Sequence, residues 1–260
     1  MNVEIIAEIA TNHGGSLALA KEFIWRCAEA GADWVKCQHT RVRHLRPDDP
    51  QYAWFQHAEF SCDQFVELKA ECERAGTKFL TTGYHAADVP EVSGLGVEAI
   101  KIGSGEAREM TLAEAAMATT IPRIFVSLGL AHNNPYESCF VPNEWAGERV
   151  VFLGCVTRYP APVGIAATVL RASAQPKPMS MWSMTSGPRW GVSGWSDHAV
   201  GLGECEAAIV GGATVIEKHV QLPNQARPCR PWEATMAELK QLRVFADEDP
   251  QRFRGRWQQA

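Results

Sequence analysis

Eight short apolar runs, each followed by a helix-like segment, are the feature of this sequence that most restricts its fold. The runs are Val3–Ile9, Trp34–Gln38, Thr77–Thr82, Ala99–Ile102, Arg123–Ser127, Val150–Cys155, Gly191–Trp195 and Thr214–His219. Most are continuously apolar rather than alternating, which is typical of parallel strands buried on both faces. Eightfold strand–helix alternation predicts an α/β fold, a single (β/α)8 TIM barrel that occupies residues 1–260 as one domain. A doubly wound open sheet is the structural alternative.

The segments between these runs carry helix start and stop signals. Ser16 is placed to cap a helix over Leu17–Ala30, which would end at Gly31. Ser61 is placed to cap the next helix, which would end at Gly76. We predict further helices over Thr111–Thr119, Ile165–Ala174, Gly203–Gly211 and Glu233–Ala246.

Composition excludes several classes of protein. Apolar residues make up 46% and charged residues 21% of the chain, which is ordinary for a globular protein. A formal net charge of −5 without any basic block predicts no binding to nucleic acid or to a membrane. The first 15 residues lack a basic n-region and no apolar run is long enough to span a membrane, so we predict a cytoplasmic protein. The eight cysteines show no zinc-knuckle spacing, and we expect them to be reduced thiols.

The segment Arg41–Phe60 is a long predicted loop after the second strand. It contains charges, two prolines and the aromatic residues Tyr52, Trp54 and Phe55. A loop of this length inside a compact domain is usually functional. We predict that it closes over a bound substrate, with Trp54 in contact with that substrate. The alternative is a surface excursion that packs its aromatic side chains onto the barrel.

Polar side chains stand at the carboxyl ends of nearly all the predicted strands, where a barrel of this kind carries its chemistry. Lys36 and Lys101 are cations in otherwise apolar strands. The hydroxyl donors near glycines are Ser104, Ser127 and Ser196. Two lysines with hydroxyl groups predict a site for a phosphate, or for a phosphate and a carboxylate. Glu8 and Glu106 are candidates for proton transfer, and the alternative is that they are counter-ions of the lysines.

His198 and His219 end successive predicted strands, so a barrel places them side by side. Alternation along the last strand puts Glu217 on the same face as His219. The same rule puts Ser196 on the face of His198. Two neighbouring imidazoles with a carboxylate nearby predict a site for a divalent metal ion with open positions for water and substrate oxygens.

Five of these strand-end strings occur together in an order that resembles one known family. They are Glu8–Gly14, Val35–Gln38, Lys101–Glu106, Ser196–His198 and Glu217–His219. Their order and approximate spacing are similar to those of the sialic acid synthase family, barrel enzymes that condense phosphoenolpyruvate (PEP) with an N-acylated amino sugar. Any one string is a weak signal, but five in order on five predicted strand ends are a specific one.

The resemblance implies a role for each matching position. The implied PEP ligands are Lys36, Gln38, Thr82, Lys101, Ser104, Ser127 and Ser196. The implied catalytic residues are Glu8, Lys36, Lys101, Glu106 and Glu217. His198 and His219 would hold Mn²⁺ or Mg²⁺, which would polarise the aldehyde of the acceptor. Carbon three of PEP would attack that aldehyde, water would add, and phosphate would leave through C–O cleavage. We assign contacts with the sugar-like acceptor to Tyr159, Asp197 and Trp54.

The sequence also departs from the family pattern. The segment Leu153–Thr157 replaces Leu-His-Cys and the polar residue after it, and Thr82–Tyr84 replaces Thr-Pro-Phe. The segment around Pro228–Arg230 lacks the acid of the usual Gly-Pro-Asp. The family resemblance implies a homodimer, but the sequence ends at Ala260, so we expect no small antifreeze-like domain to reach across it. We therefore expect an intact PEP half and an acceptor other than N-acetylmannosamine.

Two other functions are compatible with this sequence. A metal-dependent pyruvate aldolase on the same barrel needs the divalent ion but no phosphate site, so the two lysines argue against it. A non-catalytic barrel that binds a sugar or a phosphometabolite is compatible with the departures at Gly154, Thr157 and Arg230. Phosphate release from PEP in the presence of candidate aldehydes would separate the synthase from both.

Overall fold

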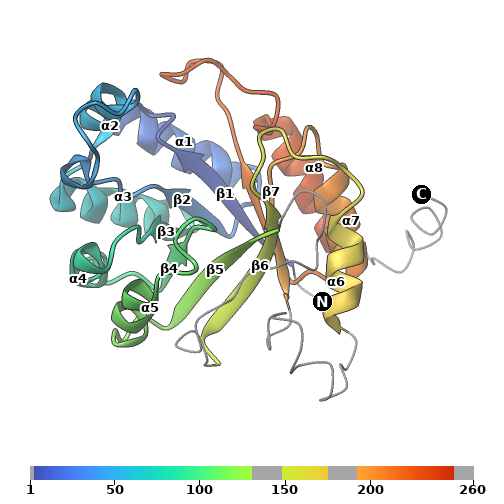
Figure 1. Ribbon diagram of the computed structural model, residues 1–260. Coiled ribbons are helices and arrows are strands. Elements are labelled where there is room, and N and C mark those ends of the chain that lie inside the picture. The colour runs from blue at the N-terminus through green and yellow to red at the C-terminus, as the bar shows by residue number, and fades with distance from the viewer. Residues whose placement is uncertain (1–2, 131–147, 175–191, 249–260) are drawn as a thin grey trace.

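The strands of this chain close into a barrel. The computed structural model describes residues 3–130, 148–174 and 192–248. Eight parallel strands pair in sequence order, and β1 also pairs with β8 (Figure 1). Their bounds are β1 (Glu4–Ala10), β2 (Trp34–Cys37), β3 (Lys78–Thr82), β4 (Ala99–Ile102), β5 (Arg123–Leu130), β6 (Val150–Val156), β7 (Gly194–Asp197) and β8 (Val215–His219). The predicted barrel is confirmed, and the open sheet is excluded.

Strand side chains point alternately into two separate apolar clusters. The inner cluster consists of Ile6, Trp34, Leu80, Ala99, Phe125, Leu153 and Val215, one residue from each of seven strands. The outer cluster joins the other strand face to the helices and includes Ile5, Val35 and Ile216. Because the period along a strand is two residues, the next inward position lies two residues further along each strand. Polar side chains occupy this next inward position on most of the strands.

Helices cover the outer face of the barrel (Figure 1). Their bounds are α1 (Leu17–Glu29), α3 (Cys62–Ala75), α4 (Val89–Gly94), α5 (Met110–Met117), α6 (Ala166–Ala174), α7 (Gly203–Gly211) and α8 (Met236–Asp247). The predicted caps are confirmed, because Ser16 accepts a hydrogen bond from the backbone N–H of Leu19 and Ser61 forms a capping box with Gln64. Gly76 ends α3 in the left-handed conformation, with φ of 75°.

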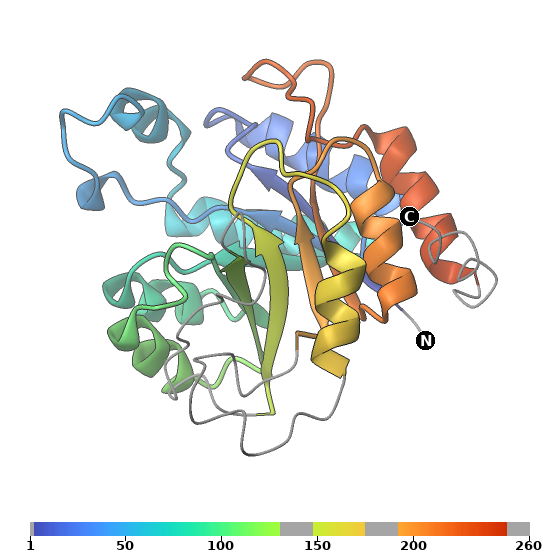
Figure 2. The same ribbon diagram turned by 45° about the vertical axis from the view of Figure 1, so that its right-hand side comes forward.

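The sequence predicted a loop over the whole segment Arg41–Phe60, and this prediction is wrong in part. The segment contains a short 3-10 helix, η1 (Val42–His44), and the seven-residue helix α2 (Tyr52–Ala58). Figure 2 shows this segment projecting beyond the barrel. The residue before α2 makes no side-chain capping bond, so the sequence carried no start signal for this helix.

Two expectations from composition also have structural counterparts. In the described part of the chain, no helix has the length and apolar character needed to cross a membrane. The cysteines in that part are free thiols, as predicted.

Candidate functional site

A ring of polar side chains lies inside the barrel, one layer nearer the carboxyl ends of the strands than the inner apolar cluster. On each strand the ring residue comes two positions after the residue of the inner layer, with Gly194 filling that layer on β7. The ring consists of Glu8, Lys36, Thr82, Lys101, Ser127, Cys155, Ser196 and Glu217, and all eight are buried. The structure therefore brings seven of the predicted site residues together in one layer.

The two ring lysines share the carboxylate of Glu217. The Nζ atoms of Lys36 and Lys101 lie 3.7 and 3.8 Å from Glu217 Oε2. Lys36 also forms an ion pair with Glu8, so Glu8 is a counter-ion of this lysine, which is the alternative that the sequence left open. Lys101 Nζ donates to Ser127 Oγ at 2.7 Å. The sequence did not reveal Glu217 as the partner that links the two lysines.

Burial and charge together set the protonation of this layer. Burial raises the pKa of Glu217, but Lys101 and Lys36 outweigh it and bring that pKa to about 2. Burial lowers the pKa of Lys101. Burial also acts to lower the pKa of Lys36, but Glu217 and Glu8 outweigh it and raise that pKa. Burial raises the pKa of both Glu8 and Glu106 above the usual carboxyl value, which suits groups that gain and lose a proton.

His198 directly follows β7 and His219 is the last residue of β8, and their ring centroids are 5.6 Å apart. His198 Nδ1 donates to the backbone oxygen of Val156 at 2.8 Å, since a carbonyl can only accept. The Tyr159 hydroxyl lies 2.9 Å from His198 Nε2. Burial lowers the pKa of both imidazoles, so both are neutral, which is the form that binds a metal ion.

A cavity of about 570 Å³ opens beside the ring, between α2 and the loops that follow β3 and β4. Gln38, Tyr84 and Glu106 line it, and α2 contributes Phe55. Sequence reasoning missed Tyr84 as a site residue. Its hydroxyl has a pKa well above the usual value because of burial, with the charges of Glu8 and Glu106 adding to the effect. The spacing of Tyr84 could have identified it, because it comes two residues after Thr82, the ring residue of β3, and side chains two residues apart along a strand point the same way.

The remaining predicted residues at the carboxyl end of the barrel are spread around the ring. Ser104 lies against β5, since a Cβ built on Gly129 would be 3.2 Å from the Ser104 Cβ. Tyr159 is half exposed beside His198. Trp54 lies at the rim, where its indole N–H donates to Thr11 Oγ1 at 3.0 Å. Of the α2 residues, Phe55 and not Trp54 is the one that lines the cavity.

Asp197 is not brought together with the other predicted residues. Its carboxylate is 2.5 Å from Lys218 Nζ and 3.4 Å from the Sγ of Cys205 in α7. Because Ser196 points into the barrel, alternation turns the next residue toward the helices. This placement removes the reason for assigning Asp197 to the acceptor, and the alternation rule alone would have shown it.

We compared the chain with known protein families to test its resemblance to the sialic acid synthases. Residues 23–244 match the NeuB family. The chain belongs to the NeuB family. The resemblance to sialic acid synthases, read from five strand-end strings, is therefore confirmed.

Relatives of this NeuB-family chain include named synthases. An N,N'-diacetyllegionaminic acid synthase of Campylobacter jejuni is 30% identical over 257 residues, which cover 92% of this chain and 73% of that protein. An N-acetylneuraminate-9-phosphate synthase of Drosophila melanogaster is 29% identical over 240 residues, which cover 85% of this chain. The match spans only 60% of the length of the Drosophila protein.

The barrel also matches solved structures. A sialic acid synthetase from Leptospira borgpetersenii serovar Hardjo-bovis, solved in complex with citrate, superposes with a TM-score of 0.74 at 24% identity. The superposition covers 98% of this chain and 86% of the Leptospira chain. The two proteins therefore share the fold of the NeuB-family barrel.

Proposed function

We propose that this chain is a PEP-dependent synthase that joins PEP to a sugar-like aldehyde and releases phosphate and a 2-oxo-3-deoxy acid. The observation that carries the proposal is the buried ring, which gathers two lysines and three hydroxyl groups at the carboxyl end of the barrel. The names of the Campylobacter and Drosophila relatives support a synthase of this kind.

PEP carries a phosphate and a carboxylate, and the ring offers donors suited to both. The proposed PEP ligands are Lys36, Gln38, Thr82, Lys101, Ser104, Ser127 and Ser196. Ionised donors form stronger hydrogen bonds with phosphate and carboxylate oxygens than neutral donors do. Glu217 supports this role, because its carboxylate lies within 4 Å of both lysine Nζ atoms and accepts from Ser196 Oγ at 2.9 Å. It would hold both ammonium groups charged and oriented before PEP arrives.

His198 and His219 fit a divalent ion, which we propose to be Mn²⁺ or Mg²⁺. Both imidazoles are neutral, and the backbone oxygen of Val156 fixes the tautomer of His198 so that its Nε2 carries the electron pair, which here accepts from the Tyr159 hydroxyl and which a metal ion would take over. A metal ion bound there would act as a Lewis acid on the acceptor carbonyl.

Glu8 and Glu106 are the proposed proton carriers. As carbon three of PEP attacks the aldehyde, the aldehyde oxygen needs a proton, and the water that adds to carbon two must lose one. Burial raises the pKa of both carboxyl groups, which makes each of them a better proton donor than an ordinary carboxyl group and leaves it able to take a proton back. Lys36 and Lys101 would stabilise the negative charge of the departing phosphate.

We further propose that the acceptor lies in the cavity beside the ring. Glu106 lines this cavity, and the charges of Lys101 and Lys36 in the ring act on its carboxyl group. Gln38 and Tyr84 add hydrogen-bonding groups to the cavity wall. Phe55 of α2 forms part of the wall, which supports a role for the segment Arg41–Phe60 in covering the acceptor. We place Tyr159 and Trp54 at the rim of this site, and we keep the expectation that the acceptor differs from N-acetylmannosamine.

The test is phosphate release from PEP with a panel of acceptors. The panel would contain aldoses, N-acetylmannosamine, other N-acylated amino sugars and their phosphate esters, each with Mn²⁺ or Mg²⁺. We expect phosphate and a 2-oxo acid to form in equal amounts with at least one acceptor. Release of pyruvate from a sugar acid without PEP would favour the aldolase, and tight sugar binding without turnover would favour the non-catalytic barrel.

A cytoplasmic location and a homodimer remain part of this proposal. Light scattering on the purified protein tests the dimer directly, and a monomer at working concentration would contradict it.

A further inference from the structure

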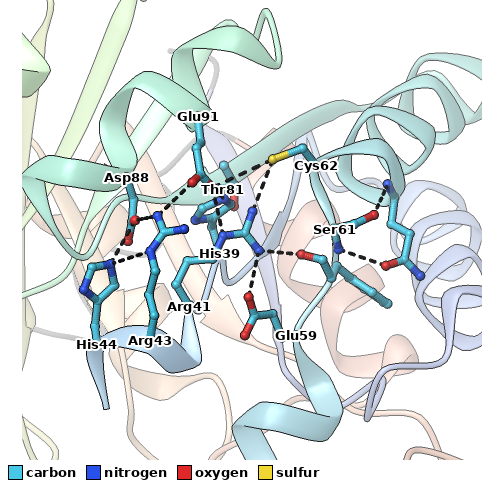
Figure 3. A network of polar contacts seen from close by, with 12 residues as sticks. His39, Arg41, Arg43, His44, Glu59, Ser61, Cys62, Thr81, Asp88 and Glu91 are labelled. Atoms are coloured by element: carbon cyan, nitrogen blue, oxygen red, sulfur yellow. Dashed lines mark hydrogen bonds and ion pairs between the residues drawn. The ribbon is translucent and has the colours of Figure 1, made fainter.

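A second group of metal-ligating side chains lies outside the barrel, away from His198 and His219. His39 follows β2, Cys62 is the first residue of α3, and Glu91 belongs to α4. One ligand atom from each of these three residues lies within 4.8 Å of the other two. Figure 3 shows the three side chains converging around the guanidinium group of Arg41. We propose that His39, Cys62 and Glu91 form a zinc site that is separate from the catalytic pair.

His39 is the residue that most needs a ligand. Its side chain is completely buried, and neither ring nitrogen has a hydrogen-bond partner within the described part of the chain. Nε2 points toward Glu91, with 3.4 Å to the Oε2 atom. Buried polar groups are normally partnered, and a metal ion bound to Nε2 would give this nitrogen the partner that it lacks. Burial also lowers the pKa of His39 to about 4, so the imidazole is neutral and free to bind a metal.

Two of the three separations between ligand atoms are close to those of a zinc site, and the third, between His39 and Cys62, is at most 4.8 Å. Bond lengths of about 2.0–2.3 Å at tetrahedral angles place neighbouring ligand atoms roughly 3.3–3.6 Å apart. The observed separations from Glu91 Oε2 are 3.4 Å to His39 Nε2 and 3.8 Å to Cys62 Sγ. A nitrogen, a thiolate and a carboxylate are all ligands that zinc accepts, and the fourth position would hold water.

The charges around the group also suit a divalent ion. Hydrogen bonds from Arg43 and Arg41 outweigh burial and lower the pKa of Glu91 to about 2, so this ligand is ionised. With Cys62 as a thiolate, the two anionic ligands balance the charge of Zn²⁺. The two arginines have counter-ions of their own, since Arg41 lies 3.4 Å from Glu59 and Arg43 forms an ion pair with Asp88.

Arg41 has the position of a group that orients metal ligands. Its Nε donates to Glu91 Oε2 at 2.9 Å, and one of its terminal nitrogens donates to Cys62 Sγ at 3.3 Å. Another terminal nitrogen donates to the backbone oxygen of Phe60 at 2.5 Å. Ligating carboxylates and thiolates are commonly held by such outer hydrogen bonds. The zinc would thus fasten both ends of the segment Arg41–Phe60 to α3 and α4.

The experiment measures zinc in a variant whose catalytic pair is removed. The His198→Ala/His219→Ala protein would be stripped with a chelator, loaded with Zn²⁺, freed of excess metal by gel filtration and assayed by mass spectrometry. We expect one zinc per chain, loss of that zinc when Cys62→Ser is added, and no change when the exposed Cys229→Ser is added as a matched control.

Cobalt gives a second readout that does not depend on the catalytic pair. Co²⁺ added to the metal-free wild-type protein should produce a thiolate-to-cobalt charge-transfer band in the near ultraviolet, and Cys62→Ser should abolish it. His39→Gln should weaken zinc binding by at least about tenfold. A double variant that binds no zinc, or a Cys62→Ser protein that keeps its zinc and its cobalt band, would overturn the proposal.

Discussion

At the scale of single residues, the face of the strand decides what a side chain does. Lys101 and Lys218 are both buried lysines near a strand end. Lys101 points inward to Ser127 and Glu217, whereas Lys218 points outward to Asp197. Alternation, counted from the inner apolar residues, assigns both lysines from sequence alone. Alternation does not tell which residue a side chain meets across the barrel. Only the structure therefore shows that Glu217 is the shared counter-ion of Lys36 and Lys101.

Metal binding by the histidine pair is the first prediction at this scale. His219→Ala removes one of the two neutral imidazoles, and we expect the affinity for Mn²⁺ to fall more than about tenfold and synthase activity to be lost. Calorimetric titration of the metal-free protein with Mn²⁺ measures the affinity. His57→Ala on α2 is the control, since His57 is exposed. Equal Mn²⁺ affinity in both variants would remove the pair from the metal site.

The second prediction concerns acid stability and His13. This side chain is buried, stacks on Phe60 at 4.2 Å and accepts the backbone N–H of Gly15. Burial lowers its pKa from 6.5 to about 4. The unfolded chain therefore binds more protons between these two values, so stability falls as the pH falls through this window. The loss from His13 at pH 5 relative to pH 7.5 amounts to about 2 kcal/mol.

Urea unfolding at the two pH values measures this loss. His13→Gln keeps a hydrogen-bonding side chain but does not titrate, so its stability should fall less on acidification than that of the wild type. Identical losses in the two proteins would show that His13 is not the titrating group.

At the scale of elements, strands were predictable and short helices were not. All eight strands appear within three residues of the expected limits in the described chain, because burial on both faces leaves a continuous apolar run. The predicted start of the seventh strand, Gly191, lies outside the described residues. Helices α2 and α4 have only seven and six residues, which is too short for an apolar stripe to repeat.

Docking of α2 is the prediction for this scale. Trp54 fastens the helix by its bond to Thr11 and lies under the guanidinium of Arg227, 4.0 Å from the ring centroid. We expect Trp54→Ala to release the segment Arg41–Phe60 and to speed its cleavage by protease several-fold without substrates. Gln56→Ala, on the exposed side of the same helix, is the control. Equal cleavage rates would mean that other contacts hold α2 in place.

At the scale of the whole molecule, barrel closure creates the site. Glu217 on β8 meets Lys36 on β2 and Lys101 on β4 only because β8 pairs with β1. No local pattern in the sequence encodes that closure, although the count of eight strands predicts it. The family strings suggested the roles that we propose for the ring residues, and the register of the closed barrel determines which of these residues are in contact.

The buried ion pair between Asp197 of β7 and Lys218 of β8 yields a stability prediction at this scale. Lys218→Met leaves the carboxylate of Asp197 buried without its cation, which costs about 3–5 kcal/mol of unfolding free energy. Removing both charges in Asp197→Leu/Lys218→Met should restore part of the loss. Urea unfolding measures both variants. A loss below about 1 kcal/mol in Lys218→Met would contradict the importance of this pair.

The most direct test of the central claim is the affinity of PEP for the ring, because it requires no knowledge of the acceptor. Calorimetric titration with PEP would compare the wild type with Lys101→Met, and with Lys240→Met on the exposed face of α8 as the control. Loss of one charge-assisted hydrogen bond, worth about 1.5–3 kcal/mol, predicts binding roughly 10- to 150-fold weaker in Lys101→Met and unchanged in the control. PEP binding as tight in Lys101→Met as in the wild type would contradict the proposal that this ring is the PEP site.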